Sequence, residues 1–121
     1  MPDWETVREL AGSLPAAEES TSYGQPVFKV AGKLFVWMSP NSDARGALAL
    51  RVDPEEKELI LETSPDVYFT VPHYDGYPAV LVRLDRIGRD ELRERIEDAW
   101  LLRAPRKLAD EHVRGRGSTT P

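Results

Sequence analysis

The chain has 121 residues, enough for one domain that buries a core without disulfides or a structural metal. It contains no cysteine, which excludes disulfide bonds, thiolate catalysis and cysteine-ligated metal clusters. Its formal net charge is −5, from 21 acidic and 16 basic side chains, so phosphate binding over the whole surface is excluded. Any basic surface must be local, and residues 23–51 and 103–116 each contain more basic than acidic side chains.

The sequence carries no sign of export or membrane insertion. No run approaches the roughly 18 apolar residues that a membrane-spanning helix needs. Residues 1–5 lack the basic and apolar regions of a signal peptide. We therefore expect a cytoplasmic protein with no membrane partner.

The N-terminal half predicts a helix followed by a β-hairpin. Asp3 can cap a helix that Pro15 ends, and an acidic connector at residues 18–19 follows. Two β-prone runs, 27–30 and 33–38, are then hinged at Ala31-Gly32. A two-residue loop there would put four apolar side chains on one face, whereas a bulged three-residue loop would shift the register by one. The four are Phe28, Val30, Phe35 and Trp37.

The C-terminal half alternates turns, strands and helices. Residues 39–46 form a turn-rich segment, and 47–52 predict a third strand. Asp53-Pro54 opens a short acidic helix to about residue 62, and an irregular aromatic segment, 63–78, leads to a buried strand at 79–84. Helical spacing over 89–102 predicts a helix that packs on the sheet, and Pro105 begins a short final turn through residue 109.

This order of elements predicts an α+β fold in which a mixed, mainly antiparallel sheet packs against helices as a two-layer sandwich. We expect one domain over residues 1–112. Residues 113–121 are rich in Gly, Ser, Thr and Arg and have little to bury, so we expect a disordered C-terminal tail.

Several motifs, taken in order, resemble the MmcQ/YjbR family of small bacterial proteins, and together they span about residues 3 to 110. The family is similar to CyaY-like, frataxin-related sandwiches and is usually described as DNA-binding. The resemblance therefore implies this fold and a DNA partner. The motifs are the first helix, Tyr23-Gly24-x-Pro26-x-Phe28-x-Val30-x-Gly32-Lys33-x-Phe35, Asp53-Pro54, Pro72-His73-Tyr74, the 79–85 strand and Ala99-Trp100-x-x-x-Ala104-Pro105-x-Lys107-Leu108.

Under the DNA-binding hypothesis, cationic side chains on or beside two hairpins and near the C-terminal end would contact phosphates of double-stranded DNA. The alternative is that lysines beside a turn only protect the sheet edge from aggregation. The candidate residues are Lys29, Lys33, Arg45, Arg51, Arg106 and Lys107.

The aromatic segment supports a different hypothesis, a pocket for a small molecule or a protein. Tyrosine and histidine rings would give flat walls with hydrogen-bonding tips. The alternative is that these rings only anchor a long loop to the core. The candidates are Tyr68, His73, Tyr74 and Tyr77.

We expect no enzymatic activity, no cofactor and no metal site. The sequence lacks a Gly-x-Ser-x-Gly elbow, a P-loop, a dinucleotide fingerprint and a His-Glu-x-x-His motif. A frataxin-like metal surface would need acidic side chains that converge, but helical neighbours one residue apart point in different directions. The acids concerned are Asp3, Glu5, Glu9, Glu55, Glu56 and Glu58.

Overall fold

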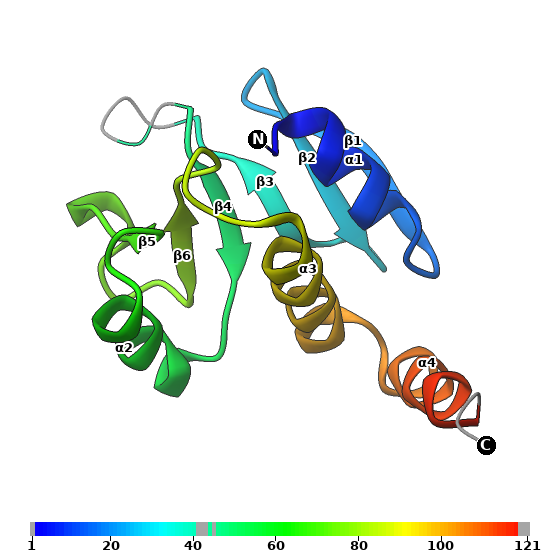
Figure 1. Ribbon diagram of the computed structural model, residues 1–121. Coiled ribbons are helices and arrows are strands. Elements are labelled where there is room, and N and C mark those ends of the chain that lie inside the picture. Colours follow the sequence, from blue (N-terminus) through cyan, green and yellow to red (C-terminus); the bar gives the residue numbers. More distant parts are fainter. Residues whose placement is uncertain (1, 41–43, 45, 119–121) are drawn as a thin grey trace.

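The computed structural model describes residues 2–40, 44 and 46–118. Six strands form one antiparallel sheet in the order β1-β2-β3-β4-β6-β5, and helices pack against it (Figure 1). The predicted α+β class is confirmed. The strands are β1 (Ala17–Ser22), β2 (Gln25–Val30), β3 (Lys33–Met38), β4 (Leu48–Arg51), β5 (Tyr68–Phe69) and β6 (Ala79–Val82). The helices are α1 (Trp4–Gly12), α2 (Pro54–Thr63), the 3₁₀ turn η2 (Pro72–Tyr74), α3 (Arg89–Arg103) and α4 (Arg106–Ser118).

Helix α1 begins where the sequence predicts. The Asp3 carboxylate accepts a hydrogen bond from the backbone N–H of Thr6 at 3.1 Å, and the Thr6 hydroxyl accepts one from the Asp3 N–H at 3.3 Å. This reciprocal capping box satisfies two of the free N–H groups at the helix start. The helix then buries Val7, Leu10 and Ala11 against the sheet and α3.

Two matching turns join the first three strands. Tyr23 and Gly24 connect β1 to β2 with φ angles of 51° and 77°, and Ala31 and Gly32 connect β2 to β3 with the same two values. Positive φ at both central residues is typical of a type I′ turn, which matches the twist of antiparallel strands. The two-residue loop at residues 31–32 is therefore the one of the two sequence-based alternatives that the structure adopts.

A bulge in β3 changes the predicted pattern of faces. Phe28 pairs with Val36 but Lys29 pairs with Leu34, so Phe35 is an extra residue in β3. Phe35 and Val36 both lie in the core on the helix side, and Trp37 lies on the opposite face. The prediction that Trp37 shares a face with Phe28 is wrong, because one added residue reverses the alternation beyond it.

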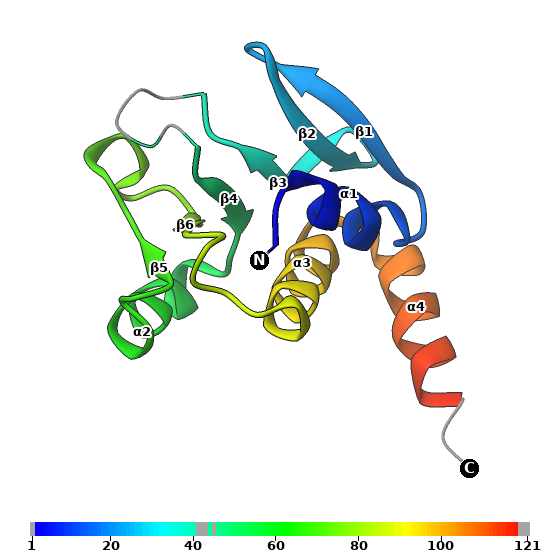
Figure 2. The ribbon, with the colours of Figure 1, turned by 45° about the horizontal axis from the view of Figure 1, so that its top comes forward.

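Two further predictions differ from the structure at the periphery. The expected acidic connector is the edge strand β1, which pairs along its whole length with β2. An edge strand tolerates charge because its outer side faces water. The short turn expected to end at residue 109 is the helix α4, which continues to Ser118 where a disordered tail was expected from residue 113. Figure 2 shows α4 extending beyond the end of α3.

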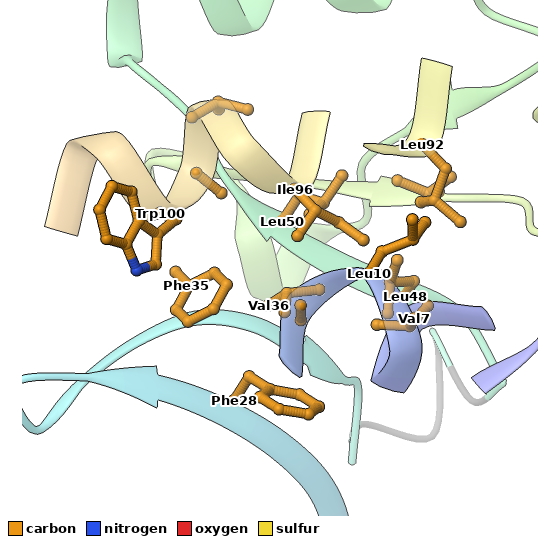
Figure 3. Close-up of a cluster of buried hydrophobic side chains, with 14 of the residues drawn as sticks. Val7, Leu10, Phe28, Phe35, Val36, Leu48, Leu50, Leu92, Ile96 and Trp100 are labelled. Atoms are coloured by element: carbon orange, nitrogen blue, oxygen red, sulfur yellow. The ribbon is translucent and has the colours of Figure 1, made fainter. Parts of the chain in front are cut away.

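The main core lies between the sheet and the layer formed by α1 and α3, with Ile60 of α2 at its margin. Phe35 is fully buried, and its ring centre lies 6.4 Å from that of Phe28. Trp100 of α3 is also fully buried, and its indole N–H donates to the Pro15 carbonyl at 3.0 Å. Figure 3 shows these rings among the aliphatic side chains of the cluster.

The other face, which we call the open face, has no α-helix over it in the described part of the chain. The segment between β5 and β6 contributes Tyr74 to the smaller hydrophobic cluster on this face. The cluster contains Val27, Trp37, Ala44, Ala47, Ala49, Tyr74, Ala79 and Leu81, with Leu34, Phe69 and Val71 packed at its margin.

Replacing Phe35 by Ala is expected to lower the free energy of unfolding by about 3–5 kcal/mol, because it leaves a cavity in the main core. Leu59→Ala is the matched control, since Leu59 lies on α2 with 63% of its surface exposed. That change is expected to stay within about 0.5 kcal/mol. Urea unfolding monitored by circular dichroism measures both, and similar losses in the two variants would contradict the assigned core.

Candidate functional site

A hollow of about 640 Å³ lies on the open face, between the β1–β2 turn, β3 and the segment that carries η2. It is aromatic and apolar, and none of its described lining residues is Asp, Glu, Lys or Arg. This is unusual in a chain in which 31% of residues are charged. The lining consists of Ser22, Tyr23, Val27, Leu34, Trp37, Met38, Pro40, His73, Tyr74 and Tyr77.

Tyr74 anchors the floor of the hollow and is only 4% exposed. Its hydroxyl accepts a hydrogen bond from the Trp37 indole N–H at 3.4 Å and shares a 3.0 Å hydrogen bond with the Ser39 hydroxyl. The indole N–H of Trp37 and the hydroxyl of Tyr74 are both buried, and each therefore needs a hydrogen-bond partner, which the other provides. This network fixes the η2 segment to β3.

Tyr77 forms a second wall, and Arg51 holds it. The Tyr77 ring meets those of Trp37 and Tyr74 edge to face, with centres 6.3 and 6.1 Å apart. The Arg51 guanidinium lies 5.3 Å from the centre of the Tyr77 ring and donates to its hydroxyl at 3.3 Å. Arg51, predicted to contact DNA, is therefore already engaged in orienting a wall of the hollow.

Lys57 of α2 also holds the segment between β5 and β6 in place. Its ammonium group donates to the carbonyls of Tyr74 and Tyr77, at 2.7 and 2.8 Å. Loss of hydration lowers the pKa of Lys57. Sequence reasoning missed this role, although one signal was available: Lys57 is the only cation in the acidic helix α2.

The structure brings together three of the four predicted pocket residues. His73, which is exposed, and the tyrosines Tyr74 and Tyr77 all line the hollow. The prediction for Tyr68 is wrong, because successive residues of β5 point to opposite faces of the sheet. Tyr68 is buried in the main core, where its hydroxyl donates to the Glu91 carboxylate and accepts from the Arg95 guanidinium at 3.0 Å.

Sequence reasoning missed the remaining walls, which come from the first hairpins. Val27, Leu34 and Trp37 face the hollow from β2 and β3, and Tyr23 lies at its rim with 91% of its surface exposed. The signal for Trp37 was ambiguous, because the face on which it lies depends on the bulge at Phe35. Tyr23 is the first residue of the hairpin motif that resembles the family, and that motif by itself does not indicate a pocket.

The predicted DNA-contacting cations are dispersed over the molecule. Lys29 is partly buried on the open face, where it pairs with Glu18 and Leu34. Arg45 lies outside the described residues. Lys33 is exposed beside the β2–β3 turn, and Lys107 is exposed at the start of α4.

One subset of these cations shares an end of the molecule. Trp100 near the end of α3 bonds to Pro15, and Ala17 pairs with Val30, so the β2–β3 turn lies near the α3–α4 junction. This places Lys33 at the same end as Lys107 and Arg106. Arg106, which is 96% exposed, reaches Asp110 at 3.9 Å.

The described residues contain no group of three or more His, Cys, Asp or Glu side chains placed to hold a metal ion. No helix among them is long and apolar enough to span a membrane. The described lining of the hollow offers aromatic rings, aliphatic side chains, hydroxyls and one imidazole.

Comparison with known proteins shows the relatives of this chain. The family model YjbR matches residues 12–102. The uncharacterized proteins Rv2570 of Mycobacterium tuberculosis and Mb2600 of Mycobacterium bovis are each 33% identical to it, over 97% of this chain and all of theirs. The crystal structure of Deinococcus radiodurans protein DR2400, with the domain DUF419, matches with a TM-score of 0.70 at 25% identity, covering 84% of this chain and 78% of that one.

The environment of Tyr68 predicts a loss of stability at alkaline pH. Burial, and next the hydrogen bond to Glu91, raise the pKa of Tyr68 to about 12, against about 10 in an unfolded chain. The folded state thus keeps a proton that the unfolded state releases between these values. The contribution of Tyr68 to stability is complete below pH of about 10 and falls as pH rises toward about 12.

Urea unfolding at pH of about 9 and about 11 measures this effect. Tyr68→Phe is expected to lose less stability than the unmodified chain between the two conditions, because it lacks the titrating hydroxyl. Tyr23→Phe is the control, since Tyr23 is exposed and should keep the full loss. Equal losses in Tyr68→Phe and the unmodified chain would contradict the burial of this hydroxyl.

Proposed function

This chain belongs to the YjbR family, and we propose that it is a non-catalytic binding module whose small-molecule ligand occupies the hollow on the open face. The observation that carries the proposal is the uncharged aromatic lining, held in place by Lys57 and Arg51 from two other elements. Ligand sites are typically concave, mostly apolar and formed before the ligand arrives. A volume of about 640 Å³ lies in the range of such sites.

The polar groups of the hollow suit recognition better than catalysis. Ser22 and His73 both line it, but among the described residues His73 lies against the Tyr74 ring, 6.1 Å between ring centres, and has no hydroxyl or carboxylate partner. A nucleophile or general base needs such a partner to be activated and oriented. The Tyr74 hydroxyl is already engaged by Trp37 and Ser39. These groups can orient a ligand without transferring its protons.

DNA binding is the second candidate, favoured by the usual description of the resembling family and by one observation. Exposed Lys33, Arg106 and Lys107 lie at the same end of the molecule, where they could contact successive phosphates. Two facts make this candidate weaker than the first. Arg51 is held by Tyr77, and the net charge of the chain is −5.

Blocking the hollow tests the first candidate. Ser22→Trp places a large side chain in the hollow, whereas Thr21→Trp places the same side chain on the other face of β1. We expect the unmodified chain and Thr21→Trp to bind a small uncharged probe, and Ser22→Trp to bind it at least about tenfold more weakly. The probes are 2-naphthol and its saturated counterpart decahydro-2-naphthol.

The readout is the indole N–H signal of Trp37 in NMR titrations, since Trp37 lines the hollow. Unfolding midpoints of both variants show whether the fold is kept. Equal affinity in Ser22→Trp and Thr21→Trp would contradict the proposed site. So would the failure of both probes to shift the Trp37 signal.

Reversing charge at the cationic end tests the second candidate. Lys33→Glu with Lys107→Glu should abolish binding to a labelled random-sequence duplex, and binding by the unmodified chain should weaken linearly with salt on a log–log plot. Arg86→Glu with Arg93→Glu changes the total charge equally at exposed positions elsewhere, and should retain more binding. No binding at low salt, or equal losses in both double variants, would exclude contacts at this end.

A further inference from the structure

Tyr23 combines three features that the fold does not require. Its φ of 51° is in the left-handed region, where a bulky side chain is uncommon and Gly, Asn or Asp is preferred. Its side chain is 91% exposed, so the described fold buries almost none of its ring. It nevertheless lines the hollow. A strained, exposed aromatic residue beside a cavity calls for an explanation outside folding.

The chain contains its own reference for this turn. Ala31 occupies the equivalent position of the β2–β3 turn with the same φ of 51°, and Gly32 follows it with the same 77° as Gly24. A methyl side chain therefore supports this geometry fully. The aromatic ring of Tyr23 adds nothing that the turn itself needs.

Tyr23 lies across the hollow from the segment between β5 and β6. Figure 2 shows the β1–β2 turn and the segment between β5 and β6 on two sides of the same end of the sheet. The second of these carries His73 and Tyr77, and Trp37 lies on the sheet between them and Tyr23. A ligand in the hollow would have Trp37 and Tyr77 on one side and Tyr23 at the opening.

We infer that Tyr23 is the specificity-determining residue of the hollow, a ring that covers a flat, uncharged aromatic or heteroaromatic group of the ligand. This inference rests on the proposed function and names the class of ligand. A flat group is favoured because aromatic rings gain most from offset stacking and edge contacts with other rings. An uncharged group is favoured because the described lining offers no opposite charge to replace lost hydration.

The exposure of Tyr23 fits this role. A ring that is solvated in the free protein can lose its own hydration when the ligand arrives, which adds to affinity only for ligands with a complementary face. The two-residue turn keeps the Tyr23 backbone fixed by the Ser22–Gln25 pair, so the ring approaches the hollow from one direction. Tyr23 would then discriminate between ligands by their shape more than by their size.

Tyr23→Asn separates this role from folding. Asn is preferred at this turn position, so the unfolding midpoint should be unchanged or higher. Affinity for 2-naphthol should fall about tenfold, while affinity for decahydro-2-naphthol, which has no flat face, should change little. The matched control is Ala31→Asn, which makes the same change of turn residue away from the hollow and should leave both affinities unchanged. Tyr23→Phe keeps the ring and should retain the preference for the flat probe.

The outcomes distinguish the two proposals. If Ser22→Trp blocks both probes but Tyr23→Asn binds 2-naphthol as tightly as the unmodified chain, the role of Tyr23 is wrong and the binding site stands. If the unmodified chain binds both probes equally, the preference for flat ligands is wrong. If neither probe shifts the Trp37 signal, both proposals fail. An equal loss for both probes in Tyr23→Asn would also overturn a selective role for the ring.

Discussion

The bulge in β3 is the constraint on which the rest of the structure depends. With Phe35 as an extra residue, Phe35 and Val36 both enter the core beneath α1 and α3, and Trp37 is turned to the open face. Without this shift, strand alternation would bury Trp37 under the helices and leave the open face without its central ring. One inserted residue thus supplies both the main core and the wall of the hollow.

The hollow also depends on how the loop between β5 and β6 is held in place. Segments of this length between strands are usually mobile, but this one is fixed at three points. Tyr74 is buried beside Trp37, Arg51 holds the Tyr77 ring, and Lys57 binds two successive turns of the loop through their carbonyls. The printed hydrogen bonds of both cations go to neutral oxygens of the loop, and no acidic side chain is among the described lining of the hollow.

The same contacts change how the basic residues are understood. Arg51 is half-buried and already donates to the Tyr77 hydroxyl, which makes it less available to phosphate than an exposed cation. The sequence alone predicts the aromatic segment and the basic hairpins as two separate candidate surfaces. In the structure Arg51 contacts Tyr77 at the hollow that Tyr74 also lines, whereas Lys33, Arg106 and Lys107 lie at another end of the molecule.

Local signals in the sequence determined the elements. The Asp3 cap, the Pro54 helix start and the Gly32 turn each depend on residues within a few positions, so α1, α2 and the β2–β3 turn could be predicted. The resemblance to the family also came from motifs that can be read in order along the chain, and the family is confirmed.

Only the tertiary structure decided which faces these elements present. The bulge at Phe35, the pairing of acidic β1 as an edge strand and the burial of Tyr68 all depend on partners far away in the sequence. The hollow itself joins residues 22–40 with residues 73–77, and Lys57 reaches it from a third element. A linear pattern cannot specify such a site, because side-chain direction reverses with every single-residue change in register.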